Sequence, residues 1–195
     1  MPVFSERNNP VEAAEPDGER GFTLLELLVA VAVVAIVATI GVPQFSNFIN
    51  NQQRTAAMNE LVYSLAYARS EALKRNQFVT LCRSTDQSSC AGAGTDWSVG
   101  WIVFANTASV NAATRNGGED LLLTFPGFES EADFATGDLA AGLVVFQPSG
   151  DLGNTATWVY CDGRGDEQAR SVIINETGRG SVSNLDADDD ALVCP

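Results

Sequence analysis

The sequence contains no histidine and few basic residues: 11 lysines and arginines stand against 25 aspartates and glutamates, and the net charge is −14. Without histidine, Ser-His-Asp and Cys-His catalytic groups and histidine metal sites are excluded. A strongly acidic chain is repelled by phosphate backbones, so nucleic acid is not an expected partner. No two carboxylates stand out as an acid/base couple. The sequence therefore predicts a protein that is not an enzyme and that uses no metal or cofactor.

One long apolar run dominates the N-terminal region. Residues 22–42 are apolar or small except for one carboxylate, Glu26. The run has the roughly 20 residues that a transmembrane helix requires. A charge at the centre of such a helix costs about 2.5–3.5 kcal/mol, so Glu26 needs an explanation.

The residues before this run predict a leader. Residues 1–20 are polar and carry three prolines, and they show no periodicity that could build a core. An ordinary secretory signal has a basic start, a shorter apolar region and a small-residue cleavage site after it. Because this start is acidic and the apolar run is too long, we do not expect an ordinary secretory signal.

The helix is expected to continue beyond the apolar run, from about Phe22 to Arg75. After Pro43 the apolar residues follow the spacing of one helical face. They are Phe45, Phe48, Ile49, Met58, Leu61, Val62, Leu65, Ala68 and Ala72. Gly41 and Pro43 should loosen or kink the helix between its halves. Residues 43–76 are thus predicted as an amphipathic half of a helix roughly 80 Å long.

Short runs of strand-forming residues occupy the rest of the chain, 77–195. The candidate strands are 78–83, 97–105, 121–125, 143–148, 157–161, 171–175, 180–184 and 191–194. Turn-forming residues separate them at the spacing typical of antiparallel sheets. A long helix followed by such strands predicts an α+β fold, with the helix packed on an antiparallel sheet or sandwich.

All four cysteines lie downstream of the apolar run, and none forms a C-x-x-C pair. An even number of cysteines behind a membrane-crossing segment predicts disulfides formed in an oxidising compartment. Three pairings are open. We favour Cys82–Cys90 and Cys161–Cys194, because each pair closes its own segment. The loop-entropy model gives about 2.6 and 3.8 kcal/mol for these bonds.

The stretch "GFTLLELLVA" at the start of the apolar run resembles the processing site of type IV prepilins and type II secretion pseudopilins. The resemblance implies a leader of residues 1–21, cut by a prepilin peptidase between Gly21 and Phe22, and N-methylation of Phe22. It also implies that Glu26 is the glutamate used in assembly. Leaders of this family are usually short and basic, so a start downstream of Met1 is left open.

The chemistry of these residues fits that role. Cleavage leaves a positive amine on Phe22, and Glu26 lies one helical turn further along. In hydrocarbon the carboxylate has no partner until the amine of another subunit reaches it, and opposite charges attract strongly at low dielectric. Glu26 would then set the register of stacked helices. The alternative is an interfacial glutamate of a plain anchor helix.

Further stretches are similar to the GspH/FimT group, which includes FimU-like minor pilins: "YARSEALKRN", "VTLCRSTDQSSC", "WSVGWIVFAN" and "NETGRGSV". The resemblance implies a pilin-like fold and a non-enzymatic subunit that initiates or caps a type IV pilus or a type II secretion pseudopilus. Its partners would be other minor pilins or pseudopilins. The protein would cross the inner membrane once, with its C-terminal domain in the periplasm, before it enters the filament.

The alternative function is that of a FimT-like, DNA-binding minor pilin for natural transformation. The relevant loop contains Arg179, but Ser181 stands where such relatives carry a second arginine. Without residues 1–21 the net charge is −11, and each phosphate contact needs a cation. DNA contact by Arg179 is therefore the weaker hypothesis.

Two short motifs also have alternative interpretations. "GRGD" at 163–166 contains an integrin-type tripeptide, but its glycines and aspartate favour a tight turn. "DADDD" at 186–190 spaces carboxylates as a calcium loop does. It lacks the glycine and the final glutamate of an EF-hand loop, so a solvated acidic loop is favoured over an irregular calcium site.

Overall fold

The computed structural model describes residues 21–107, 114–115, 118–128, 132–137, 142–153 and 155–194. The predicted leader, apart from Gly21, lies outside these residues. The chain divides into two compact units, Met1–Ser46 and Asn47–Pro195, and each is described by itself.

Helix α1 spans Leu24–Arg75 and begins two residues later than expected. Gly41 and Pro43 both lie within it. Its buried face begins at Ala57 and continues through Met58, Leu61, Leu65, Ala68 and Ala72, as the apolar spacing predicted. Phe45 and Phe48 belong to the same sequence pattern but are exposed, so the amphipathic face that packs on the domain is shorter than the pattern suggested.

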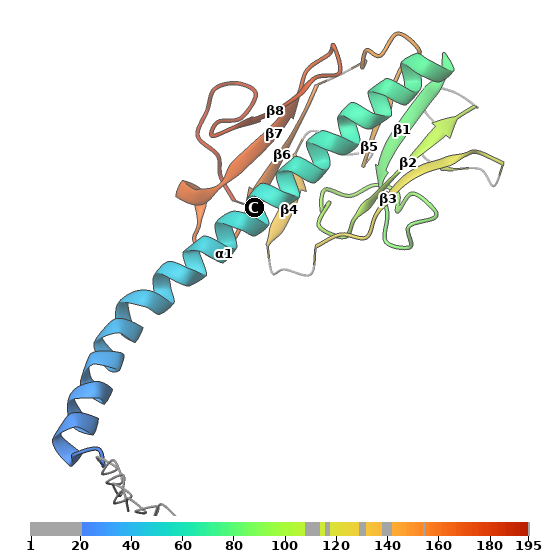
Figure 1. Ribbon diagram of the computed structural model, residues 1–195. Coiled ribbons are helices and arrows are strands. Elements are labelled where there is room, and N and C mark those ends of the chain that lie inside the picture. The colour runs from blue at the N-terminus through green and yellow to red at the C-terminus, as the bar shows by residue number, and fades with distance from the viewer. Residues whose placement is uncertain are drawn as a thin grey trace, which may run out of the picture. The chain divides into compact units, whose positions relative to one another are not determined.

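In the described part of the chain, eight strands form two four-stranded antiparallel sheets after the helix (Figure 1). The first sheet has the order β3-β2-β1-β5, with β1 at Phe78–Arg83, β2 at Trp101–Asn106, β3 at Leu121–Phe125 and β5 at Leu143–Phe146. The second has the order β4-β6-β7-β8, with β4 at Asp133–Thr136, β6 at Ala156–Cys161, β7 at Arg170–Ile174 and β8 at Gly180–Ser183. A short 3-10 helix, η1, spans Asp166–Gln168. The α+β plan with a helix packed on antiparallel sheets is confirmed.

Three strand predictions need correction. Strand β4 was missed because "DFAT" is short and has one large apolar residue. Residues 97–100 form a turn instead of the start of β2. Gly100 adopts a φ of +106°, and a Cβ at this position would lie 2.4 Å from the Phe125 carbonyl oxygen. Residues 191–194 make only an isolated bridge, between Ala191 and Leu185.

The core lies where the C-terminal part of α1 meets both sheets. Trp97, Trp101 and Trp158 are fully buried in it. The indole of Trp101 stacks on Phe125, with ring centroids 4.3 Å apart. Its Nε1 donates a hydrogen bond of 2.9 Å to the hydroxyl of Ser64, which explains a polar residue on the buried face of the helix.

Candidate functional site

The first turn of α1 holds Glu26 in a defined position. Thr23 precedes the helix, and its hydroxyl oxygen accepts a hydrogen bond of 3.2 Å from the backbone amide of Glu26. The Thr23 carbonyl accepts another from the amide of Leu27. Thr23 is thus the N-cap residue and Glu26 is the third helical residue, the spacing of a capping box. The T-x-x-E pattern in the sequence could have revealed this cap, but sequence reasoning passed over it.

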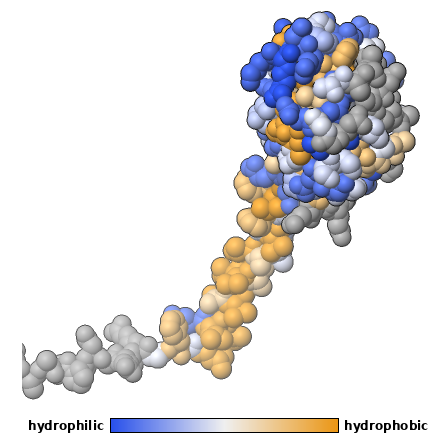
Figure 2. All heavy atoms as spheres, turned by 90° about the vertical axis from the view of Figure 1, so that its right-hand side faces the viewer, coloured by the Kyte–Doolittle hydropathy of each residue, from blue (hydrophilic) through white to orange (hydrophobic). Residues whose placement is uncertain are grey.

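Glu26 is surrounded by apolar side chains. An open hollow of about 390 Å³ beside it is lined by Phe22, Leu27, Ala30, Val31 and Val34 as well as by Glu26 itself. The side chains along this part of α1 are exposed and hydrophobic (Figure 2). By length and composition, the helix could cross a membrane.

No cation is available to Glu26 from its own helix half. In the sequence, Glu26 is the only charged residue between Phe22 and Gln53. A carboxylate in such a segment is costly unless a positive group from elsewhere pairs with it.

Both disulfides join the cysteines that the sequence favoured. Cys82 and Cys90 are linked with Cα atoms 5.6 Å apart, and Cys161 and Cys194 with Cα atoms 5.7 Å apart. Cys82 packs in a small cluster with Ile102 and Phe104. The second bond fastens the C-terminal segment to the end of β6.

The "GRGD" loop is folded against the helix and the C-terminal segment. Arg164 forms a salt bridge of 2.6 Å with Asp162 and donates a hydrogen bond of 2.8 Å to Asn51 on α1. The hydrogen bond from Arg164 holds the pKa of Asp162 below its usual value. Asp166 accepts a hydrogen bond from the amide of Cys194. Both charges of the tripeptide are thus used within the domain, as expected for a structural turn.

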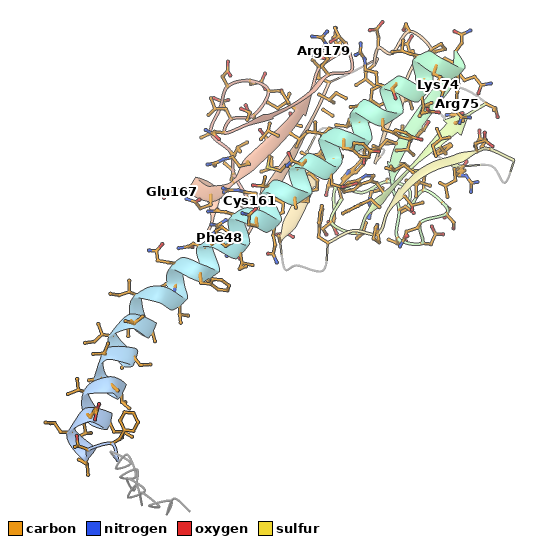
Figure 3. The ribbon with its side chains drawn as sticks, viewed as in Figure 1. Phe48, Lys74, Arg75, Cys161, Glu167 and Arg179 are labelled. Atoms are coloured by element: carbon orange, nitrogen blue, oxygen red, sulfur yellow. A yellow bond between two sulfur atoms is a disulfide. The ribbon has the colours of Figure 1, made fainter. Side chains whose placement is uncertain are left out.

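The C-terminal end of α1 carries an ion-pair network. Arg75 lies 2.6 Å from the buried carboxylate of Glu71, and Lys74 lies 3.1 Å from it. Arg75 also bridges to Asp120, just before β3. The hydrogen bonds from Arg75 and Lys74 lower the pKa of Glu71. Figure 3 places both cations at this end of the helix.

Arg179, the candidate DNA contact, lies on the hairpin between β7 and β8 (Figure 3). Its side chain is exposed, and it lines an open groove together with Arg69 of α1. Sequence reasoning missed Arg69, because no local pattern links a helix residue to a loop 110 positions later. Arg69 and Arg179 thus place two positive charges in the same groove at the surface of the domain.

The acidic loop is organised by its own backbone. One carboxylate oxygen of Asp186 accepts hydrogen bonds of 2.9 Å from the amides of Asp188 and Asp190. Within the described part of the chain, no three acidic or cysteine side chains converge as metal ligands. The geometry therefore gives no support to the calcium hypothesis.

Comparison with protein families decides the classification. Residues 57–178 match the family model "Type II transport protein GspH", and residues 17–42 match the "Prokaryotic N-terminal methylation motif". The chain belongs to the GspH family. The first match lies within the helix-and-sheet domain, and the second contains Gly21, Phe22 and Glu26.

Curated relatives of this GspH-family chain are similar over short stretches. The "Type IV major fimbrial protein FimA" of Dichelobacter nodosus is 43% identical over 42 residues, which are 22% of this chain and 27% of that protein. A "Fimbrial protein" of Pseudomonas aeruginosa is 32% identical over 68 residues, 35% of this chain and 44% of that protein. The chain therefore covers less than half the length of the curated relatives it matches.

The fold of the GspH-family chain resembles that of a solved minor pilin. Two crystal structures of the type IV minor pilin FimU of Pseudomonas aeruginosa align with TM-scores of 0.53 and 0.50, both at 23% identity. The first alignment covers 74% of this chain and 96% of FimU, and the second covers 66% and 91%. At this identity the likeness establishes a pilin-like fold.

Proposed function

We propose that this chain is a non-enzymatic minor pilin or pseudopilin subunit. It assembles into a type IV pilus or a type II secretion pseudopilus, which it helps to initiate or cap, and thereby supports pilus biogenesis or protein secretion. The observation that carries the proposal is the lone carboxylate of Glu26 in the first turn of an exposed apolar helix, where Thr23 caps the backbone amide of Glu26. Membership of the GspH family and the methylation motif support it.

Assembly would begin with processing. A prepilin peptidase cuts between Gly21 and Phe22, and Phe22 is methylated on its new amine. The amine stays positively charged and lies near the membrane-embedded end of the helix. It pairs with Glu26 of a neighbouring pilin or pseudopilin, which offsets the cost that each charge bears alone in hydrocarbon.

The location follows from the same elements. The apolar half of α1 would cross the inner membrane once, and the domain of residues 47–195 would face the periplasm before assembly. Two disulfides in that domain are consistent with an oxidising compartment. The processed subunit then enters the filament with its helix among those of its neighbours.

A DNA-binding role remains the second candidate, and the exposed Arg179, which shares a groove with Arg69, favours it. The domain holds most of the acidic residues of the chain, and Ser181 occupies the place of a second arginine. Two arginines in one groove of an acidic domain provide few phosphate contacts. We therefore favour assembly over DNA uptake.

The substitution Glu26→Gln tests the assembly role. It keeps the shape of the side chain but removes the charge, so the subunit should still insert in the membrane and fold. Its recovery with sheared filaments or partner minor subunits should fall to background at matched membrane abundance. Glu60→Gln, which removes a carboxylate from the same helix outside the apolar segment, is the matched control and should assemble normally. Normal recovery of Glu26→Gln would show that the charge does not direct assembly.

A further inference from the structure

Strand β8 lies at one edge of the second sheet, as the last strand in the order β4-β6-β7-β8. Among the described residues it pairs with β7 alone, with Val172 opposite Val182 and Ile174 opposite Gly180. Opposite residues of an antiparallel strand pair alternate between hydrogen-bonded and non-hydrogen-bonded pairs. The hydrogen bond from the Asn175 amide to the Arg179 carbonyl makes these two residues a hydrogen-bonded pair. By this alternation, the backbone groups of Gly180 and Val182 point away from β7. An edge of this kind can accept another strand.

The hairpin turn brings this edge close to α1. Gly178 has a φ of +73°, and a Cβ on it would lie 2.5 Å from the Gly150 carbonyl oxygen, so the position requires glycine. A Cβ on Gly180 would lie 3.4 Å from Leu65 of the helix. The hairpin therefore packs closely against the helix, with Arg179 and the start of β8 at the surface.

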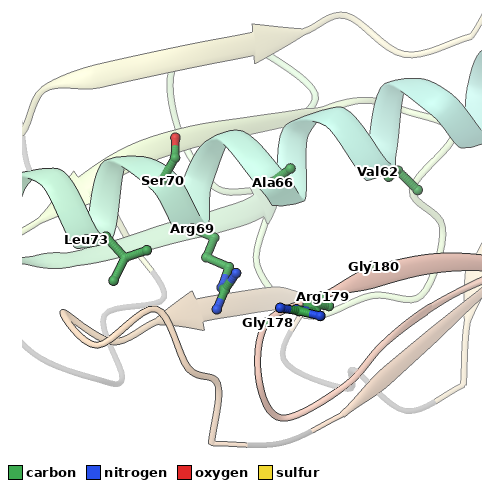
Figure 4. A pocket seen from close by; sticks show the side chains of 8 residues that line it. All are labelled: Val62, Ala66, Arg69, Ser70, Leu73, Gly178, Arg179 and Gly180. Carbon is green, nitrogen blue, oxygen red and sulfur yellow. The ribbon is translucent and has the colours of Figure 1, made fainter.

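A groove of about 320 Å³ lies between the helix and this hairpin (Figure 4). On its helix side, Val62, Ala66 and Leu73 give apolar surface beside Ser70, and Arg69 and Arg179 supply the charge. Figure 4 shows Arg69 extending from the helix toward the hairpin that carries Arg179. The groove thus combines an apolar wall with two guanidinium groups.

The two arginines retain unused hydrogen-bonding capacity. Arg69 donates through Nε to the Gly150 carbonyl, and the described residues offer no hydrogen-bond acceptor to its terminal nitrogens. The Arg179 side chain likewise has no acceptor among them, although its backbone amide is bonded to Asn175. By contrast, Lys74, Arg75 and Arg164 are in salt bridges. Two guanidinium groups with unused donors, side by side in a chain of net charge −14, suit an anionic ligand.

We propose that the groove and the β8 edge together dock an extended segment of a neighbouring pilin-type subunit. The segment would add as a strand beside Gly180 and Val182 and place a carboxylate between Arg69 and Arg179. Its apolar side chains would cover Val62 and the exposed Val182. This inference rests on the proposed function, because it takes the partner to be another subunit of the same filament.

The chemistry of the groove favours a peptide over nucleic acid. An open strand edge offers backbone donors and acceptors in the pattern that an extended peptide completes, and alternate apolar side chains give specificity. A phosphate backbone would use neither the edge nor the apolar wall. It would also be repelled by a domain in which acids outnumber bases.

The test uses the full-length chain in membranes of its own host. Ala66 is exposed in the groove and is replaced by a photo-reactive, diazirine-bearing amino acid. Illumination should link it to another pilin-family subunit, identified by mass spectrometry of the adduct. Arg179→Gln should lower the yield about tenfold, as the loss of one charge-assisted hydrogen bond implies. Val182→Pro should lower it similarly, since proline blocks an incoming strand without removing a bond to β7.

Two controls separate the possible outcomes. Lys74→Gln removes the same charge from an exposed side chain outside the groove and should leave the yield unchanged. A second photo-reactive residue at Val34 reports assembly through the apolar helix. Three outcomes would overturn the docking site alone. They are subunit adducts at Val34 without any at Ala66, Ala66 adducts whose yield neither groove variant changes, and Ala66 adducts with nucleic acid. No adduct from either position would overturn the proposed function as well.

Discussion

Substitution of Ser64 by alanine tests how α1 is fixed to the first sheet. The Ser64 hydroxyl accepts a hydrogen bond from Nε1 of Trp101 at 2.9 Å, and both residues are fully buried. Alanine would leave the indole N–H without an acceptor in the core, which costs about 1–3 kcal/mol. The free energy of unfolding of the domain should fall by that amount, while the groove and the apolar helix stay unchanged.

The measurement is urea denaturation of the full-length protein in detergent, followed by tryptophan fluorescence. All three tryptophans, Trp97, Trp101 and Trp158, lie in the domain of residues 47–195, so the signal reports this unit even in the intact chain. Ser70→Ala is the matched control. Its exposed hydroxyl donates a hydrogen bond to the carbonyl of Tyr67 on the same helix, so a change within about 0.5 kcal/mol is expected. Equal effects of the two substitutions would refute the reasoning.

Two further predictions concern pH and the longer disulfide. The pKa of Glu71 and the pKa of Asp162 are lowered in the folded domain by hydrogen bonds to basic side chains. Both carboxylates therefore contribute stability above their ordinary pKa values of 4.5 and 3.8, and the contribution is lost as the pH falls through the folded values. The urea concentration at the unfolding midpoint should stay constant from neutral pH down to about pH 5 and should decrease once the pH is below about 4. An unchanged midpoint at pH 3 would contradict this prediction. Replacing Cys161 and Cys194 by alanine should lower the free energy of unfolding by about 3.8 kcal/mol, and replacing Cys82 and Cys90 should lower it by about 2.6 kcal/mol. A larger loss for the Cys82–Cys90 pair in the same denaturation assay would refute the loop-length argument.

Much of the fold could be predicted from local patterns in the sequence. The apolar spacing from Met58 to Ala72 identified the face of α1 that the core buries. The bounds of β1 and β3 agree with their predicted ranges, because each is an apolar run between clear turn signals. Strand β4 could not be found in this way, since its register is set by pairing with β6 and by the bridge between Asp96 and Ala135.

For the candidate site too, local sequence features could be predicted and long-range contacts could not. Glu26 was identified because a lone carboxylate in an apolar run is a local feature of the sequence. The role of Arg164 was not, because its partners include Asn51, more than a hundred residues away. The proximity of Arg69 to Arg179 could not be predicted either. It results from the packing of the helix against the hairpin, and no sequence spacing indicates it.

The mature N-terminus tests the central claim most directly. Intact mass spectrometry of protein extracted from membranes, with fragmentation of its first residues, identifies where the chain begins and whether the terminal amine is modified. A prepilin-type subunit predicts a chain that starts at Phe22 and carries one added methyl group on its amine, with Glu26 as its fifth residue. A mature terminus beyond Pro43 would mean that the apolar helix is removed as an ordinary signal, and it would contradict the account.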